Sequence, residues 1–318
     1  MESYCLKIAL DSTPAVFHTG MYVALGKGWF NDEELAVRFI SPDEDNYYMT
    51  PAQKLWHGKV DLAILRPEEL TCLNISEPAH RFIALATLLQ DNTQAIGIRK
   101  EMGVARLAHL DGKRYAYMGL PYEHRFLRCL IKQDRGKGKY EAIETGTAGA
   151  WRAFLRRQVD VVRYHTIWEG VDAACRHIPL TSFMINEQHV PYRYTHVLCV
   201  RDDVWQQKQE AIRAFLRVVA EGYYFATEHP DSAANLLMEG ARHPSLNNIR
   251  FLYQSQLRAL PHYGGKDWGK MDIQHWRALW EGMLEHKVLL GPDKKVLDHL
   301  PFAIEEVIQP VLQKETAI

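Results

Sequence analysis

Short apolar runs alternate with amphipathic stretches along the first two hundred residues of the chain. Cys5–Leu10 has the apolar character of a strand, and the turn-prone segment Asp11–Pro14 follows it. The pattern from Phe17 to Leu25 predicts a helix, which Gly26 closes. Strands that alternate with helices in this way are typical of largely parallel sheets with helices on both faces.

The same alternation continues through the middle of the chain. Thr50 followed by Pro51 is a favourable helix start, with threonine as the N-cap and proline in the first turn. The further strand and helix candidates are Val37–Ile40, Pro51–Gly58, Val60–Leu65, Pro67–Asn74, Arg81–Leu89, Gly112–Met118, Tyr122–Gln133 and Val159–Val162.

Beyond Arg201 the pattern becomes helical. One long helix is predicted over Gln206–Thr227, and His229–Pro230 stops it. Shorter helices are predicted over Ser232–Met238, Leu246–Ala259, Asp272–Glu285 and Pro301–Val311. We therefore expect two sheets, with a helical C-terminal tail that returns to cover the first.

Composition narrows the class of protein. The chain has 318 residues, which suggests about two domains, and its 47% apolar and 24% charged content is that of a globular protein. The formal net charge of −1 gives no excess positive field for a phosphate backbone, so no nucleic-acid partner is expected. The longest apolar run, Phe82–Leu89, is far shorter than the roughly 18–20 residues of a membrane span.

The cysteines and the N-terminal residues give a prediction of the cellular compartment in which the protein resides. The five cysteines are scattered without paired spacing, which favours reduced thiols and predicts neither a structural zinc nor a redox dithiol. Met1–Tyr4 leads directly into a strand without a signal peptide. As the chain stands, this predicts a cytoplasmic protein, and a periplasmic one if a leader has been removed.

Most motifs of catalysis are missing, and we expect no metal or cofactor. The chain has no His-Glu-x-x-His, no phosphate-binding loop and no Gly-x-Ser-x-Gly. Polar residues instead follow predicted strands, where open α/β sheets place ligands, although an ordinary loop position is the alternative for each. These residues are Asp11–Ser12, Arg66, Glu68–Glu69, Gln90–Asp91, Gly119–Glu123 and Tyr164–His165.

The chain resembles one known family. The turn Asp11–Pro14, His18 and the segment Lys27–Phe30 follow the family's opening, which reads Asn-Trp-x-Pro, Tyr-His, a helix and Lys-Gly-Tyr-Phe. This family contains the thiamine-pyrimidine (hydroxymethylpyrimidine phosphate) synthases and the pyrimidine-precursor-binding proteins of transporters. Later segments that resemble it or the related sulfonate- and nitrate-binding proteins are Gly58–Ala63, Leu110–Gly119, Val159–Asp160 and Trp268–Met271.

The resemblance implies an α/β, two-lobed periplasmic-binding-protein-like fold of type II, with mixed, mostly parallel sheets. Lobe one is expected over residues 1–92 plus 197–318, and lobe two over residues 93–196, with the ligand cleft between them. The departures from the family pattern concern the synthase reaction. Leu65 and Glu69 occupy the positions of the cofactor lysine and the substrate histidine, and Pro191–Thr195 replaces the cysteine-rich run. Without the lysine no Schiff base forms, so we expect a non-synthase member that uses no pyridoxal phosphate.

We therefore expect a protein that holds a planar, aromatic or heteroaromatic and in some cases anionic ligand without transforming it. Aromatic side chains suit such a ligand, an arginine can take its anionic group, and Gly119 with Thr147 marks two helix starts that can cradle a polar end. The expected ligand-binding residues are Asp11, Ser12, His18, Arg66, Glu69, Gly119, Tyr122, Glu123, Thr147, Tyr164, Trp168 and Tyr192.

Two alternatives stay open at this point. The first is a cytosolic enzyme on the same fold, such as a decarboxylase of dihydroxylated aromatic acids, which also resembles the chain. Its acid–base groups would come from Glu69, Glu123, His18 and His165. The second is a regulatory or metabolite-sensing domain. The expected partners are a small-molecule ligand and, if the protein is exported, a transporter permease; the chain is expected to be a monomer or a homodimer.

Overall fold

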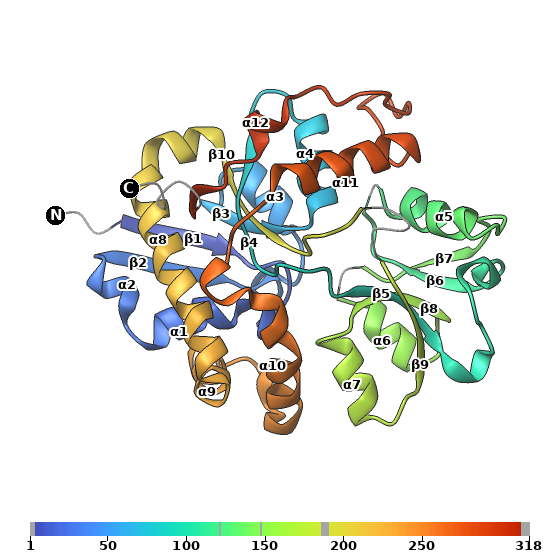
Figure 1. Ribbon diagram of the computed structural model, residues 1–318, viewed down its shortest axis with the longest axis horizontal. Coiled ribbons are helices and arrows are strands. Elements are labelled where there is room, and N and C mark those ends of the chain that lie inside the picture. The colour runs from blue at the N-terminus through green and yellow to red at the C-terminus, as the bar shows by residue number, and fades with distance from the viewer. Residues whose placement is uncertain (1–3, 121, 147, 186–190, 313–318) are drawn as a thin grey trace. The chain divides into compact units, whose positions relative to one another are not determined.

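The computed structural model describes residues 4–120, 122–146, 148–185 and 191–312 (Figure 1). The chain divides into two compact units. Unit 1 comprises Met1–Asp91, Tyr194–Ile273 and Phe302–Ile318, and unit 2 comprises Asn92–Arg193 and Gln274–Pro301. In the described part of the chain, no helix has both the length and the apolar character needed to cross a membrane.

Unit 1 is built on a five-stranded sheet with the order β2-β1-β3-β10-β4. Strand β1 pairs in parallel with β2 and β3, whereas β10 runs antiparallel between β3 and β4. Figure 1 shows β10, which comes late in the chain, among strands of the first ninety residues. The strands are β1 (Tyr4–Ala9), β2 (Leu35–Ile40), β3 (Leu62–Leu65), β4 (Phe82–Thr87) and β10 (Val197–Arg201).

Helices surround this sheet, and two of them approach each other very closely. A Cβ atom on Gly222 would lie 2.0 Å from the carbonyl oxygen of Gly20, so the backbones of α1 and α8 are in direct contact. Only glycine permits such an approach. The helices are α1 (Thr19–Gly26), α2 (Trp29–Asp32), α3 (Pro51–Trp56), α4 (Pro67–Ser76), α8 (Asp202–Glu228), α9 (Pro230–Ala241), α10 (Ile249–Tyr263) and α12 (Ile304–Val307).

Unit 2 contains a second five-stranded sheet, with the order β7-β6-β8-β5-β9. Strands β7, β6 and β8 are parallel, and β5 pairs antiparallel with β8 and β9. The strands are β5 (Gln94–Arg99), β6 (Arg114–Tyr117), β7 (Glu141–Glu144), β8 (Val161–His165) and β9 (Leu180–Met184). The helices are α5 (Glu123–Gln133), α6 (Ala150–Leu155), α7 (Glu169–Cys175) and α11 (Ile273–Glu285).

The segment that follows α11 groups with unit 2 because it is hydrogen-bonded to α5. The side-chain nitrogens of Gln133 and His286 lie 2.8 Å apart, and the Arg125 guanidinium donates to the carbonyl of Lys287 at 3.0 Å. From the sequence, the whole tail is expected in lobe one. The proposed lobe boundaries stay a prediction.

The α/β class and the mixed, mostly parallel sheets are confirmed, but two predicted helices differ. The predicted helix from Phe17 is a 3-10 turn, η1 (Val16–His18), followed by α1. The predicted helix Pro301–Val311 is helical only over α12. Its continuation pairs with the sheet instead, because the backbone N–H of Gln309 donates to the carbonyl of Ala84 at 2.9 Å.

Candidate functional site

Three polar residues meet at one edge of the unit 1 sheet. Asp11 and Arg66 follow the parallel strands β1 and β3, and His196 precedes the antiparallel strand β10. The carboxyl ends of β1 and β3 and the amino end of β10 therefore share this edge. Carboxyl edges of parallel strands are the usual place for ligands in open α/β sheets.

The centre of this edge is the carboxylate of Asp11, which two histidines contact. His18 Nε2 lies 2.9 Å from Asp11 Oδ1, and His196 Nε2 lies 3.3 Å from Asp11 Oδ2. The backbone N–H of Ala15 donates to His18 Nδ1 at 3.2 Å. Because Nδ1 of His18 is an acceptor, its ring carries the proton on Nε2 and donates it to Asp11.

The pKa values of the Asp11 and Glu69 carboxyl groups are shifted in opposite directions. Burial alone would raise the pKa of Asp11. The charges of His196 and His18, the hydrogen bond from His18 and the charge of Arg66 outweigh burial and hold this pKa well below its usual value. Burial raises the pKa of Glu69, against the opposing effect of Arg66.

Arg66 and Glu69 are joined at the start of α4. The backbone N–H of Arg66 donates to Glu69 Oε2 at 3.0 Å, and the guanidinium lies 3.6 Å from the same oxygen. Both side chains are half-buried. Glu69 thus closes a capping box on the first turn of the helix, which fixes its carboxyl beside the strand edge.

A buried polar network holds the start of α1 in place, and sequence reasoning missed it. Thr19 Oγ1 donates to Gln256 Oε1 at 2.9 Å, and the hydroxyl of Tyr263 donates to the carbonyl of Val16 at 2.7 Å. The hydroxyl of Tyr223 donates to the carbonyl of Phe17. These bonds anchor η1 to α8 and α10, so they fix the position of His18.

A second set of contacts holds the turn after Asp11. In η2 (Pro42–Asp45), Asp43 Oδ2 lies 3.0 Å from His243 Nε2. His243 Nδ1 accepts from the backbone N–H of Ser245 at 3.1 Å, and the Ser245 hydroxyl donates to the carbonyl of Pro14 at 3.0 Å. We call Asp43, His243 and Ser245 the loop clamp. It connects three loops, one of which carries Asp11.

Ser12 and Leu65 complete the predicted positions of unit 1. The Ser12 hydroxyl donates to the neighbouring carbonyl of Thr13 at 3.2 Å, so it contacts its own turn. Leu65 ends β3, pairs with Val197 and is fully buried. The position that resembles the cofactor lysine is therefore part of the apolar core.

In unit 2, the carboxylate of Glu123 is hydrogen-bonded to neighbouring groups of the same turn and strand. It accepts from the Tyr115 hydroxyl at 3.0 Å and from the backbone N–H groups of Met118 and Leu120 at 2.9 and 3.4 Å. Such a carboxylate stabilises the turn before α5, where the N-terminal N–H groups need acceptors. Burial and the neighbouring Glu123 raise the pKa of Tyr115 well above its usual value.

The turn around Gly119 contains the other predicted residues of this region. Gly119 has a φ of +93°, and a Cβ atom built on it would meet nothing within 4 Å. Its backbone is therefore open on that side. The Tyr122 side chain is buried at the N-cap of α5. Thr147 lies outside the described residues.

Tyr164 packs in the core of unit 2. A Cβ atom on Gly97 would lie 2.5 Å from the Tyr164 ring, which covers that glycine. The Tyr164 hydroxyl is 2.6 Å from Ser182 Oγ, and the Trp151 ring stacks at 5.9 Å. Trp168 is half-buried at the start of α7. The structure thus gives Tyr164 a packing role.

The opposite face of the unit 2 sheet carries a chain of polar contacts that starts at Arg163. Its Nε–H donates to Gln94 Oε1 at 2.6 Å, and Gln94 Nε2 lies 3.2 Å from His165 Nε2. His165 Nδ1 lies 2.8 Å from Thr93 Oγ1. The guanidinium also faces the Tyr192 ring at 5.4 Å. Tyr192 therefore packs on a buried cation.

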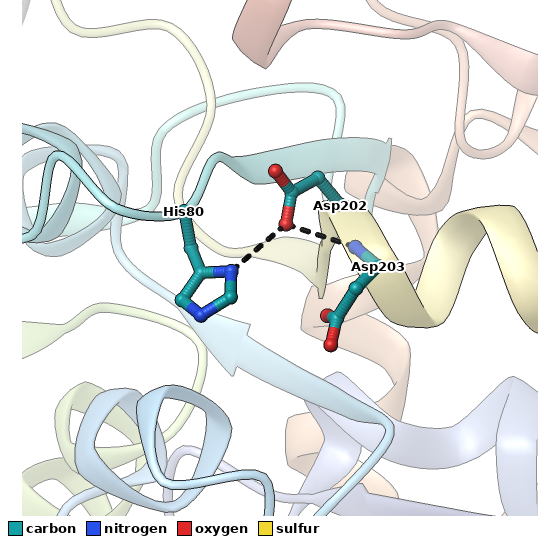
Figure 2. A group of neighbouring side chains, drawn as sticks. All are labelled: His80, Asp202 and Asp203. Carbon is teal, nitrogen blue, oxygen red and sulfur yellow. Dashed lines mark hydrogen bonds and ion pairs between the residues drawn. The ribbon is translucent and has the colours of Figure 1, made fainter.

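One further cluster has the composition of a metal site. In the described part of the chain, ligand atoms of His80, Asp202 and Asp203 lie within 4.8 Å of one another (Figure 2). The Arg201 guanidinium, however, binds both oxygens of Asp203 at 2.6 and 2.8 Å. Asp202 accepts from two backbone N–H groups, those of Arg81 and Asp203. Since a guanidinium already neutralises one carboxylate, we assign the two aspartates to the first turn of α8, where negative charge is favourable.

Comparison with known proteins places the chain in a family. The family model described as NMT1/THI5 like matches residues 16–233, which is more than half of the chain. The chain belongs to this family. The matched segment includes His18, Arg66, Glu69 and His196.

Individual known proteins are also similar to this chain over nearly its whole length. The formylaminopyrimidine-binding protein of Halalkalibacterium halodurans is 22% identical over 306 residues, which cover 90% of this chain and 87% of that protein. The periplasmic nitrate-binding protein NrtA of Synechocystis PCC 6803 aligns with a TM-score of 0.71 at 14% identity, covering 99% of this chain and 89% of that one.

The periplasmic aliphatic sulphonate binding protein SsuA of Escherichia coli aligns with a TM-score of 0.67 at 14% identity, covering 97% of this chain and 93% of that one. These similarities confirm the periplasmic-binding-protein-like fold that the sequence predicted. At such identities they speak for the fold alone.

Proposed function

We propose that this protein binds a small heteroaromatic molecule of the pyrimidine-precursor type and releases it unchanged. The observation that carries the proposal is the Asp11 centre, a carboxylate fixed by two buried histidines at the carboxyl edge of a sheet. The similarity to a formylaminopyrimidine-binding protein supports the ligand class. Asp11, Arg66 and Glu69 are the proposed contacts in unit 1.

In unit 2, some of the predicted residues already have partners within the protein. Glu123 and Tyr164 are engaged in local packing. Gly119 has open backbone, and Trp168 is half-buried, so these two remain the proposed contacts there. Since the similar proteins include components of import systems, we also propose a transporter permease as partner if this chain is exported.

The test is a search for the ligand followed by its titration. Native mass spectrometry of the purified protein should reveal a co-purified small molecule, and calorimetry should give a saturable heat with a formylaminopyrimidine. Asp11→Ala should weaken this binding at least about tenfold, or about 1.4 kcal/mol. Asp267→Ala, which removes an exposed carboxylate paired with Lys270, is the matched control and should bind as the wild type does.

A second candidate is an enzyme, such as a decarboxylase of dihydroxylated aromatic acids. One observation favours it. The pKa of Asp11 is lowered and that of Glu69 is raised at the same sheet edge, and such pairs often divide the roles of anion and proton donor. Release of carbon dioxide from a dihydroxyphthalate, abolished by Glu69→Gln, would establish this activity. Absence of turnover with retained binding supports the binding protein.

A further inference from the structure

The charges of the chain are divided unequally between its two units. Unit 2 contains 21 arginine and lysine residues against 14 aspartate and glutamate residues, which gives a net charge of +7. Unit 1 contains 17 basic against 25 acidic residues, which gives a net charge of −8. The net charge of −1 for the whole chain is therefore the sum of a basic and an acidic unit. Much of the basic excess lies in residues 106–141, which include nine basic and four acidic residues.

Most of the acidic residues in this segment are bonded to neighbouring groups. Asp134 binds the guanidinium of Arg106 at 2.7 Å. Asp111 accepts from the backbone N–H groups of Lys137 and Lys139 at 2.5 and 2.7 Å, so it holds the backbone of these two lysines. The other two acidic residues are Glu123, which is buried at the start of α5, and Glu141, which is exposed at the start of β7.

Five basic side chains gather where α5 ends and a glycine-containing loop follows. The loop folds back on the helix, since a Cβ atom on Gly138 would lie 2.6 Å from Cγ of Arg128 and 3.3 Å from Cγ of Lys132. Only glycine permits so close an approach. We define the α5 basic patch as these five exposed residues: Arg128, Lys132, Arg135, Lys137 and Lys139.

The backbone of the α5 basic patch is fixed, whereas its charges are left available. The N–H of Gly136 donates to the carbonyl of Ile131 at 2.9 Å, and the N–H of Gly112 donates to the carbonyl of Lys139 at 2.7 Å. Among the residues that the structure describes, no carboxylate forms an ion pair with any of the five patch side chains. Like charges on a fixed backbone repel one another, so a negatively charged partner is favoured here over scattered surface lysines.

We propose that the α5 basic patch is a docking surface for an acidic segment of a partner protein. This interaction goes beyond the proposed ligand binding and uses none of its contact residues. The patch presents its charges on exposed side chains, while the N–H groups of Lys137 and Lys139 are occupied by Asp111. It therefore differs from the cradle of free backbone donors that holds a small phosphate, and it fits carboxylates spread along a peptide.

Two observations favour an acidic protein segment over a membrane or a nucleic acid. None of the exposed large apolar side chains in the described part of the chain lies on α5 or in the loop 134–140, so the patch has no apolar anchor for a bilayer. The whole chain has a net charge of −1, which gives no long-range attraction for an extended polyanion. A short acidic segment contacts only the patch, where charges act within a Debye length of about 8 Å.

Fluorescence anisotropy with a fluorescein-labelled octaglutamate peptide tests the proposal. The wild-type protein should bind octaglutamate at least about tenfold more tightly than the neutral octaglutamine at low ionic strength. An increase in sodium chloride from about 50 to about 200 mM should weaken the binding of octaglutamate at least about threefold, because salt screens exposed charges.

Two double variants locate the binding. Lys137→Glu combined with Lys139→Glu should weaken the binding of octaglutamate at least about tenfold, since it replaces attraction by repulsion at two positions. The matched control is Arg152→Glu combined with Arg156→Glu, which reverses two exposed charges at α6 in the same unit and should bind as the wild type does. Should the lysine variant not fold, as judged by circular dichroism, Lys137→Gln combined with Lys139→Gln replaces it and should weaken binding at least about threefold.

Three results would overturn the proposal. The first is equal affinity of the wild type for octaglutamate and octaglutamine, and the second is unchanged affinity of the folded lysine variant. The third is binding to phosphatidylserine vesicles or to a short DNA duplex without binding to octaglutamate, which would assign the patch to a membrane or to nucleic acid. The lysine variant should bind a formylaminopyrimidine as the wild type does, so failure of the docking surface leaves the proposed function standing.

Discussion

At the scale of single residues, the most consequential feature is the ionised carboxylate of Asp11. It is held by a hydrogen bond with His18 and by a close contact with His196, and its pKa lies below that of the unfolded chain. The unfolded state therefore takes up this proton first as the pH falls. The resulting stabilisation is complete above about pH 5 and declines as the pH falls below about 3.9.

This linkage predicts an effect of Asp11→Asn on acid stability. The free energy of unfolding of the wild type should fall more steeply between about pH 5 and pH 2 than that of the variant, by on the order of 2 kcal/mol over the range. Urea titrations at each pH measure both curves. Asp267→Asn serves as the comparison for loss of an exposed carboxylate. Parallel curves for wild type and Asp11→Asn would contradict the depressed pKa.

The role of Tyr164 is also a residue-scale question. Because a Cβ atom on Gly97 would lie 2.5 Å from its ring, Gly97→Ala should destabilise the protein by about 1–3 kcal/mol. In a Tyr164→Ala background the same substitution should cost clearly less, since the ring is gone. Chemical denaturation of the four proteins gives the coupling energy. Purely additive costs would mean that Tyr164 does not pack on Gly97.

At the scale of elements, the sequence predicted the order of strands and helices in the first half well. Buried runs such as Leu62–Leu65 are short and apolar on both sides, and the proline of Thr50–Pro51 marks a true helix start. Strands β5, β7, β9 and β10 were not predicted; β5, β7 and β9 mix polar and apolar side chains without strict alternation, and β10 directly precedes the long helix α8. The predicted helix Pro301–Val311 is wrong beyond α12 because the backbone there hydrogen-bonds to strand β4 instead.

The candidate site was predictable in part, and for a specific reason. Asp11 and Arg66 follow parallel strands, so their place at one edge could be inferred. His196 precedes an antiparallel strand, and only knowledge of the β3–β10 pairing brings it to the same edge. Gln256 and Tyr263 lie on a helix more than two hundred residues away from Thr19 in the sequence. No local sequence pattern predicts their hydrogen bonds with Thr19.

The loop clamp gives a prediction at the element scale. His243→Ala removes the contact to Asp43 and the acceptor for the Ser245 backbone, which should loosen the turn before Pro14. We expect a loss of stability of about 1–2 kcal/mol and a threefold to tenfold weaker affinity for a formylaminopyrimidine. Thermal melts and calorimetry measure the two effects, and the exposed His299→Ala is the control. Unchanged affinity with reduced stability would limit the clamp to a structural role.

At the scale of the whole molecule, family and fold leave the ligand open. Proteins with this fold that align along nearly the whole chain are named for nitrate and for sulphonate. The strand ends of this chain carry the carboxylates of Asp11 and Glu69 together with the guanidinium of Arg66. The residues at the strand ends, rather than the fold, must therefore determine what this protein binds.

Hydrogen exchange with and without a bound formylaminopyrimidine tests the central claim most directly, because it locates the ligand without altering the protein. The account predicts slower exchange in peptides that cover residues 10–19 and 65–72, which carry Asp11, His18, Arg66 and Glu69. Peptides around His80 and Asp202, which lie together at the start of α8, should exchange as before. Binding with unchanged exchange over residues 10–19 and 65–72 would contradict a ligand site at the Asp11 centre.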